Sequence, residues 1–262
     1  MPNLDTRTTK TPAVDDYTYL LSNDGTVEGK VELQNVTVIP ETTRTINFTS
    51  SQTAAQIQAD IDAVGKYLPT NASITFQFAD GTYSLDAALQ IQGFYGGGQI
   101  NIQGNTSETN ASTLHTTQEV VLDFKGNSTH GLRPQNNQVK VFIYNLRIEV
   151  DDAYIAVVLQ QSPSYNRLWY CYLLVNGTGA NGYGLLANNS SSIETRSIYL
   201  TGGQNGLYAG QNTTVYSNIT DDTGTQPQYG LRASSGIIYK SGTQPTGSTG
   251  NEQTTGGGQI FS

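Results

Sequence analysis

The feature that most constrains this chain is a short pattern that recurs between residues 130 and 240. It reads small residue, aliphatic residue, any residue, small or apolar residue, any residue, amide. The aliphatic member is Leu132, Val157, Leu185, Leu207 and Leu231, which gives spacings of 25, 28, 22 and 24 residues. Repeats of this length are stable only when they stack on their neighbours, as in solenoid proteins. The pattern therefore predicts a stack of similar coils.

A second set of apolar positions lies between the copies. Apolar residues alternate, shift phase by one residue at Asn145, Tyr172 or Ser197, and alternate again. Alternation is typical of a strand, and the shift predicts a corner between two short strands. The expected inward residues are Val141, Ile143, Leu146 and Ile148, then Leu168, Tyr170, Leu173 and Val175, then Ile193, Thr195, Ile198 and Leu200. Each repeat then forms one coil of a parallel β-helix; an antiparallel sandwich is the alternative.

The amide position of the pattern predicts a ladder along one corner of the stack. Its members are Asn136, Gln161, Asn189, Gln211 and Ser235. Stacked amide side chains can hydrogen-bond to the coils above and below, so we expect a structural role for them and no chemistry. After Ile237 and Ile238 the pattern is lost, which predicts β-helix coils over 126–240 and a C-terminal tail over 241–262.

Two elements precede the repeats. Short alternating strands around an Asn23-Asp24-Gly25 turn predict a hairpin in an N-terminal module, residues 1–40. Residues 51–68 carry apolar side chains near helical spacing and end at Pro69, which predicts one helix. We expect it to cover the open edge of the first coil, so that 41–125 holds the capping helix and first coils.

Composition excludes several classes. The chain of 262 residues has 28 Gly, 16 Tyr and 13% charged residues, which suits strands and tight turns better than helical bundles. The net charge of −8, without a Lys/Arg cluster, argues against nucleic-acid binding. No apolar run is long enough for membrane insertion, and no cleaved export signal is expected. The lone Cys171 is interpreted as a small apolar filler.

The opening coils show a family resemblance. A strand from Ile74, an Asp80-Gly81-Thr82-Tyr83 turn and an Ile100-x-Ile102-x-Gly104 strand, preceded by a helix, resemble pectate-lyase-like right-handed β-helices of bacteriophage tail fibres and tailspikes. The segments Asp15-Asp16-Tyr17 and 29–33 are similar to virion-attachment ends of tail proteins. The closing 256–261 segment is similar to a tail-fibre terminus.

The resemblance implies a homotrimer on the virion tail, made in the host cytoplasm. Its N-terminal module would attach to other tail or baseplate proteins, and its β-helix would bind a bacterial surface polysaccharide without a cofactor. The leading expectation is thus a receptor-binding tail fibre that is not an enzyme. The alternatives are a tailspike depolymerase, either a glycan hydrolase or a lyase, and a purely structural fibre or baseplate component.

The enzyme alternative depends on a suitably placed pair of carboxylates. Glycan hydrolysis needs two carboxylates at a defined separation, and the candidates are Asp151, Asp221 and Glu194. The Asp151-Asp152 and 221–222 pairs are better interpreted as turn residues, and Glu194 is expected in one column with Phe142 and Trp169, without a neighbouring acid. No cluster of His, Cys or carboxylates indicates a metal site. An active site between subunits stays open.

Aromatic residues at outward positions are the candidate ligand contacts. Tyr199, Tyr208, Tyr216 and Trp169 offer ring surfaces on which a sugar can pack. The alternative is that Phe142, Trp169 and Leu174 form an apolar subunit interface.

Overall fold

The computed structural model describes residues 17–21, 27–32, 41–106, 119–177, 181–221 and 225–262. The chain divides into two compact units, Met1–Ile39 and Pro40–Ser262. In the first unit, β1 (Tyr17–Leu21) and β2 (Val27–Glu32) pair antiparallel. The predicted hairpin strands are confirmed, whereas the expected turn at 23–25 lies outside the described residues.

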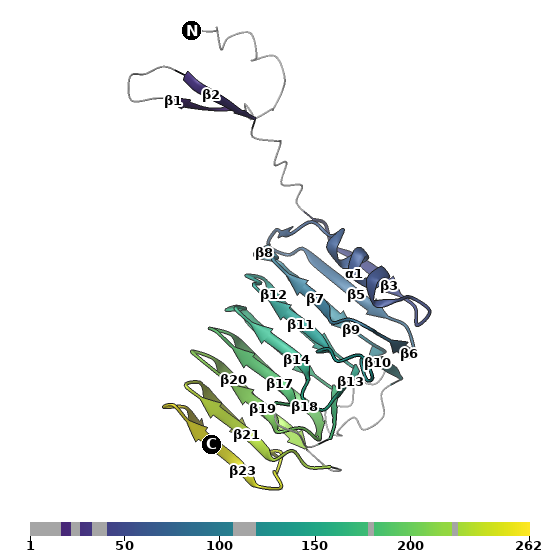
Figure 1. Cartoon of the computed structure of the whole chain (residues 1–262), viewed down its shortest axis with the longest axis vertical. Helices are drawn as coiled ribbons and strands as arrows, with labels where there is room; N and C mark the ends of the chain where they lie inside the picture. The colour runs from purple at the N-terminus through teal and green to yellow at the C-terminus, as the bar shows by residue number, and fades with distance from the viewer. Residues whose placement is uncertain (1–16, 22–26, 33–40, 107–118, 178–180, 222–224) are drawn as a thin grey trace. The chain divides into compact units, whose positions relative to one another are not determined.

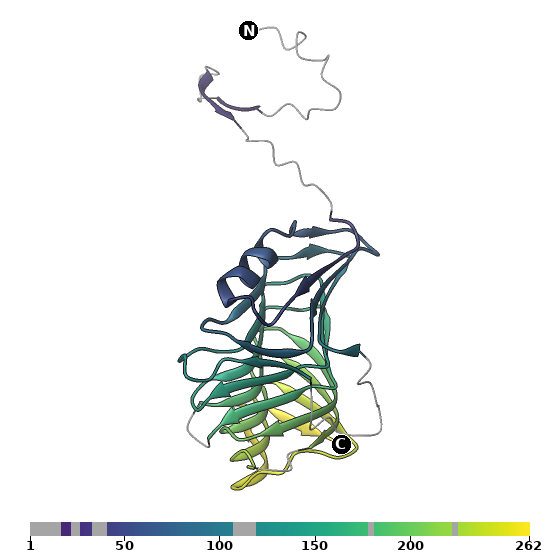
Figure 2. The same ribbon diagram turned by 90° about the vertical axis from the view of Figure 1, so that its right-hand side faces the viewer.

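The second unit is a right-handed parallel β-helix of about eight turns. Its strands stack in parallel register, which excludes the antiparallel sandwich (Figure 1). Three walls enclose the core, and Figure 2 shows the stack from the side. The first wall contains β3 (Arg44–Phe48), β5 (Ser73–Phe78), β9 (Gln99–Gln103), β12 (Lys140–Tyr144), β15 (Tyr165–Trp169), β18 (Ser192–Thr201), β20 (Thr214–Asp221), β22 (Ile237–Ser241) and β24 (Gln259–Phe261).

The other two walls follow the same stacking. The second wall contains β6 (Gly81–Ser84), β10 (Val120–Asp123), β13 (Arg147–Asp151) and β16 (Tyr172–Asn176), and it continues into the second half of β18. The third wall contains β7 (Leu89–Gln92), β11 (Leu132–Gln135), β14 (Ile155–Gln160), β17 (Tyr183–Asn188), β19 (Asn205–Ala209), β21 (Tyr229–Ser234) and β23 (Gly250–Thr255). A short pair, β4 (Tyr67–Leu68) with β8 (Tyr95–Gly96), lies in the first coils.

The aliphatic column of the repeat is confirmed on the third wall. Leu132, Val157, Leu185, Leu207 and Leu231 pair in succession from β11 to β21, and every one of them is fully buried. The column also extends one coil further back, to Leu89 on β7. Leu89 and Leu132 are 43 residues apart, so the repeat spacing does not include Leu89, although first coils were expected over 41–125.

The corner between the first and second walls uses left-handed backbone. Asn145, Tyr170 and Ser197 have φ of 53°, 56° and 50°. A single residue in the left-handed conformation turns the chain and shifts by one residue the positions that face inward. Residues other than Gly, Asn and Asp adopt this conformation rarely. The predicted shifts at Asn145 and Ser197 are confirmed. The shift expected at Tyr172 is wrong, since it falls at Tyr170.

A buried amide explains that error. Asn166 takes the inward position beside Val141, where its Oδ1 accepts the Val141 N–H at 2.9 Å. Its Nδ2 donates to the carbonyls of Ser162 and Ser192. Leu168 therefore aligns with Ile143, and Cys171 rather than Tyr170 enters the core. The expected second coil was two residues out of register, because its first inward position holds a polar residue that an apolar pattern does not include.

The expected filler role of Cys171 is confirmed. The thiol is fully buried, and burial raises its pKa to about 12. A protonated, inaccessible thiol is a weak nucleophile.

The single predicted helix is α1 (Ala54–Asp62), shorter than the expected 51–68. Thr53 and Gln56 form a capping box at its start. Ala54, Ile57 and Ile61 face the core, and Ala55 is exposed. The side chain of Gln58 covers the edge strand β7: its Nε2 donates to the Gln90 carbonyl at 3.0 Å, and its Oε1 accepts the Gln90 N–H at 2.8 Å. The predicted cap on the first coil is thus present (Figure 2).

The expected C-terminal tail is corrected. β23 pairs in parallel with β21, and β24 pairs with β22, so residues 250–261 add a further coil. Glu252 occupies the column of Leu231 and is exposed. The pattern was lost here because this coil replaces aliphatic residues by polar ones. Lys240 on β22 forms an ion pair with Glu252.

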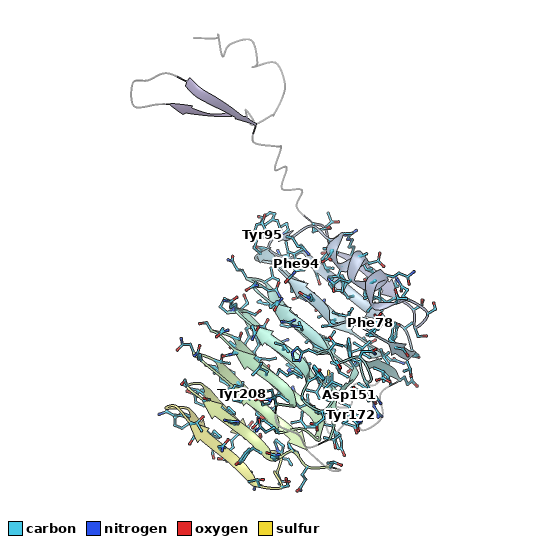
Figure 3. All side chains as sticks on the ribbon, viewed as in Figure 1. Phe78, Phe94, Tyr95, Asp151, Tyr172 and Tyr208 are labelled. Atoms are coloured by element: carbon cyan, nitrogen blue, oxygen red, sulfur yellow. The ribbon has the colours of Figure 1, made fainter. Side chains whose placement is uncertain are left out.

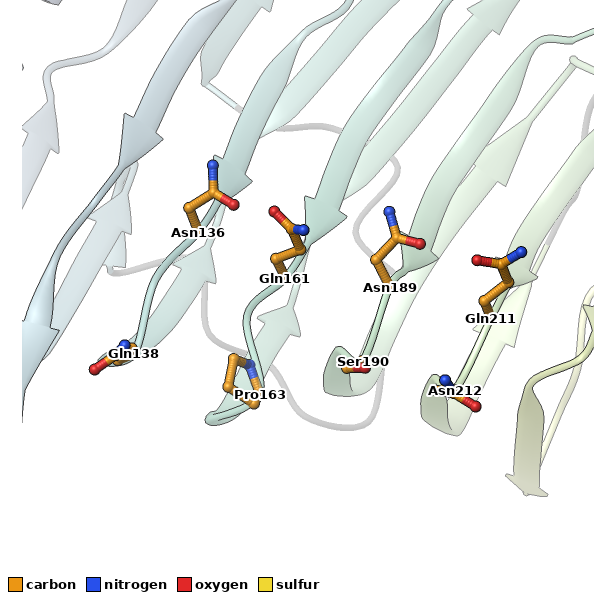
Figure 4. Close-up of a pocket in the computed structure, with 8 residues that line it drawn as sticks. All are labelled: Asn136, Gln138, Gln161, Pro163, Asn189, Ser190, Gln211 and Asn212. Carbon is orange, nitrogen blue, oxygen red and sulfur yellow. The ribbon is translucent and has the colours of Figure 1, made fainter.

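The amide ladder is also corrected. Side chains at Asn136, Gln161 and Gln211 are exposed and face outward, in a row along the stack (Figure 4). The hydrogen bonds at this corner come from a neighbouring buried column, which contains Asn137, Ser162, Ser191 and Thr213. Asn137 Oδ1, for example, accepts the Phe94 N–H, and its Nδ2 donates to the Ile91 carbonyl at 2.7 Å. The hydrogen-bonded ladder is therefore the buried column, and the outer amides contact solvent.

Candidate functional site

The outer side of the first wall gathers aromatic and charged side chains from successive coils. Residues two apart on a strand share one side of it, and parallel pairing aligns them with equivalent residues of the next coil. We call this surface the aromatic face; its residues are Phe142, Tyr144, Tyr165, Arg167, Trp169, Glu194, Arg196, Tyr216, Tyr239 and Phe261.

Three rings stack at the C-terminal end of the aromatic face. The ring centroids of Tyr216 and Tyr239 are 5.4 Å apart with planes 13° from parallel. Those of Tyr239 and Phe261 are 5.5 Å apart at 23°. This spacing corresponds to a slipped stack, in which each ring supports the next. Tyr216 and Tyr239 keep 43% of their surface exposed, and Phe261 keeps 41%. Large rings held rigidly and left open are good contact surfaces for a ligand.

Arg167 organises the other end of the face. Its guanidinium lies 4.7 Å from the ring centre of Phe142, 4.5 Å from that of Trp169 and 5.4 Å from that of Tyr165. Such contacts stabilise a cation over aromatic rings. Phe142 is buried to 7% exposure within the single chain. The expected apolar stripe is therefore corrected, because Phe142 is covered and Leu174 lies on the second wall.

A polar groove lies between these two ends. It has a volume of about 250 Å³, and its lining includes Tyr165, Glu194, Tyr216 and Tyr239. The Tyr165 hydroxyl donates to the Glu194 carboxylate, and Arg167 Nε lies 3.8 Å from the same carboxylate. Burial, followed by the neighbouring Glu194, raises the pKa of Tyr165 above its ordinary value. The groove thus offers a carboxylate and a protonated phenol between open rings, which can bind hydroxyl groups.

The structure separates the aromatic residues that the sequence proposed together. Trp169 and Tyr216 lie on the aromatic face. Phe142 and Glu194 share a column, as expected, but its middle member is Arg167; the expected place of Trp169 in it is wrong, since Trp169 aligns with Tyr144 and Arg196. Glu194 lies between Arg167 and Tyr216. As expected, neither cross-strand neighbour is acidic.

The other two candidate rings lie elsewhere. Tyr199 is on the second-wall half of β18, where it is 7% exposed. Its ring centroid lies 4.6 Å from that of Tyr172. Tyr208 is on the third wall, half-buried beside Tyr183 and Arg232 (Figure 3). Neither adds to the aromatic face.

Asp151 ends β13 and acts at a turn. Its Oδ2 accepts the Gly126 N–H at 2.6 Å, and its carbonyl accepts the Tyr154 N–H at 3.2 Å. Ala153, in the same turn, has a φ of 72°. Asp221 ends β20 beside Tyr199 of the second-wall half of β18, and its side chain lies outside the described part.

Sequence reasoning missed one carboxylate pair on the second wall. Asp123 and Glu149 are cross-strand neighbours on β10 and β13. Lys125 forms ion pairs with both, and Arg147 forms a second ion pair with Glu149. Glu149 is 4% exposed, and its hydrogen bond is the main cause that raises the pKa of Lys125. Both acids are neutralised within the chain, so this cluster stabilises the wall rather than offering a free acid and base.

The sequence also contained an unused signal for the aromatic face. Tyr216, Tyr239 and Phe261 are spaced by 23 and 22 residues, which is the repeat length. The expectation that the solenoid ends near residue 240 hid this column.

Taken together, these observations define a parallel β-helix protein with partly exposed aromatic rings in register along one wall. Within the described residues, no group of His, Cys, Asp and Glu is arranged to hold a metal ion. None of the described helices is long and apolar enough to cross a membrane. In comparisons with known proteins, no family model matches the chain, and no curated protein or solved structure gives a significant match.

Proposed function

We propose that this protein is a receptor-binding tail fibre of a bacteriophage, and that its aromatic face binds a bacterial surface glycan. The observation that carries the proposal is the run of open rings next to the Glu194 carboxylate and the Arg167 guanidinium. Ring surfaces pack on the apolar faces of sugars, and the charged groups hydrogen-bond to their hydroxyls. A homotrimer, attached through residues 1–40 to other tail or baseplate proteins, would present several such faces together.

Binding without cleavage is the form of the proposal that the carboxylates support. Glu194 accepts a hydrogen bond from Tyr165 and has no acid beside it on the neighbouring strands. Asp123 and Glu149 are held in ion pairs. Hydrolysis would need one carboxylic acid to donate and one carboxylate to attack or activate water.

The test is to incubate the purified full chain with cells and extracted surface polysaccharide of candidate hosts. Both binding and the appearance of new reducing or unsaturated ends are followed. We expect binding without new ends. New ends would favour the depolymerase, and neither binding nor cleavage would favour the purely structural fibre.

A matched pair of substitutions tests the aromatic face itself. Tyr216→Ala removes a ring that is 43% exposed and stacked at 5.4 Å on Tyr239. Tyr95→Ala removes a ring that is 39% exposed and 5.4 Å from Tyr67, in the first coils. We expect Tyr216→Ala to weaken glycan binding by roughly tenfold or more, as for a central contact residue, and Tyr95→Ala to leave it unchanged. Equal effects of the two substitutions would contradict a glycan site on this face.

A further inference from the structure

A second groove follows the corner between the third and first walls, apart from the aromatic face. Its volume is about 640 Å³ (Figure 4). One side is the outward row Asn136, Gln161, Asn189 and Gln211, with one amide from each of four successive coils. Figure 4 shows these amides pointing the same way, with Ser190 and Asn212 below them. All residues that line the groove are uncharged.

The amides of this row are free to bind a ligand. Within the described residues, the side chains of Asn136, Gln161, Asn189 and Gln211 make no hydrogen bond to protein atoms, and Asn136, Gln161 and Gln211 are exposed. An amide side chain carries two N–H donors and a carbonyl acceptor with two lone pairs. Four free amides in line therefore offer alternating donors and acceptors along the groove.

The backbone beneath the row is rigid. Asn136, Gln161 and Asn189 hold left-handed φ of 55°, 48° and 54°. The Asn136 N–H donates to the Gln160 carbonyl at 3.0 Å, and the Asn212 N–H donates to the Ser235 carbonyl at 3.1 Å, so each coil is tied to the next. A site whose backbone is already ordered loses less conformational entropy when a ligand binds.

The spacing and the charge define the ligand class. Coils repeat at about 4.8 Å, close to the length of one sugar unit in an extended chain. Neutral amides satisfy hydroxyl groups without the desolvation that a charged ligand would require, and the chain's net charge of −8 repels polyanions. We infer that the amide groove is a second glycan site, which binds a neutral, extended polysaccharide along the β-helix axis. It is independent of the aromatic face, and together the two sites would give bivalent attachment.

The experiment measures binding of neutral linear hexasaccharides by isothermal titration calorimetry. The probes are a β-1,4-glucan, a β-1,4-mannan and an α-1,4-glucan, with an oligogalacturonate as the charged counterpart. The variant is the double substitution Gln161→Leu/Gln211→Leu, which keeps side-chain size and removes the hydrogen-bonding groups. The control is Gln259→Leu, exposed on β24 outside the groove.

We expect at least one neutral hexasaccharide to bind more tightly than the oligogalacturonate. The double variant should weaken that binding by about tenfold or more, as for the loss of several hydrogen bonds. Gln259→Leu should leave it unchanged, and Tyr216→Ala is measured beside it to separate binding at the aromatic face from binding in the groove. No binding of any neutral probe, or an undiminished affinity of the double variant, would overturn the inference. If only Tyr216→Ala lost hexasaccharide binding, the binding would belong to the aromatic face, and the inference would be overturned as well.

Discussion

His130 illustrates how a single side chain couples pH to the stability of the coil corner. Its Nδ1 accepts the Ile155 N–H at 3.1 Å, and its ring meets Tyr154 edge-on. Burial, followed by the nearby Arg133, lowers the pKa of His130. The folded chain therefore favours the neutral imidazole, in which Nδ1 can accept a hydrogen bond.

The sign of the pH effect follows from this shift. The unfolded pKa is about 6.5 and the folded pKa is lower, so the contribution to stability is present above pH 6.5. It is lost as the pH falls through the folded pKa. The substitution His130→Asn retains an acceptor oxygen but has no group that titrates between pH 7.5 and 5.5. We predict that, when the pH falls over this range, the variant loses less free energy of unfolding than the native chain. Urea denaturation at several pH values measures this, and identical pH profiles would contradict it.

At the scale of elements, α1 depends on its first turn. The Thr53 hydroxyl accepts the Gln56 N–H at 3.3 Å, and the Gln56 Oε1 accepts the Thr53 N–H at 2.9 Å. These bonds satisfy donors that a helix start leaves free. The helix in turn positions Gln58 over the edge of β7. A weaker cap should therefore expose the first coil.

We predict that Thr53→Ala lowers the free energy of unfolding by about 1 kcal/mol. Gln56→Ala should cost less, because its loss leaves the Thr53 hydroxyl bond in place. The double variant should cost less than the two single costs added, since both belong to one reciprocal pair. Thermal or urea unfolding of the three variants provides the measurement. Strictly additive costs would show that the two bonds act independently.

At the scale of the whole molecule, the core runs along the axis of the β-helix and thins toward the last coil. Leu185 lies between Val157 and Leu207 and is fully buried. Ile260 on β24 is partly buried against the same core. Each coil contacts mainly its two neighbours, so the cost of a cavity depends on its place in the stack.

We predict that Leu185→Ala costs about 2 to 5 kcal/mol, as in a closed core, and that Ile260→Ala costs less than about half of that. Urea denaturation of the full chain measures both. A loss for Ile260→Ala as large as that for Leu185→Ala would mean that the last coil is covered, as it would be by another subunit.

The sequence by itself determined the repeat and therefore the class of fold. Leu132, Val157, Leu185, Leu207 and Leu231 recur at coil length because each must fill the same place in a stacked core, and this requirement acts locally on every repeat. The hairpin strands, the helix that covers the first coil and the buried thiol of Cys171 follow from equally local patterns.

The tertiary structure decided register, extent and site. Asn166 enters the core because its amide bonds to three coils at once, and an apolar pattern cannot show that. Leu89 joins the column only after a long insertion, and the last coil is recognised by backbone pairing rather than by side chains. The aromatic face joins residues from Phe142 to Phe261, and the outer amides line a groove instead of a ladder. The register between coils decides which side chains meet, and one inserted or polar residue can shift it. Hydrogen bonding between strands that are distant in the sequence determines that register.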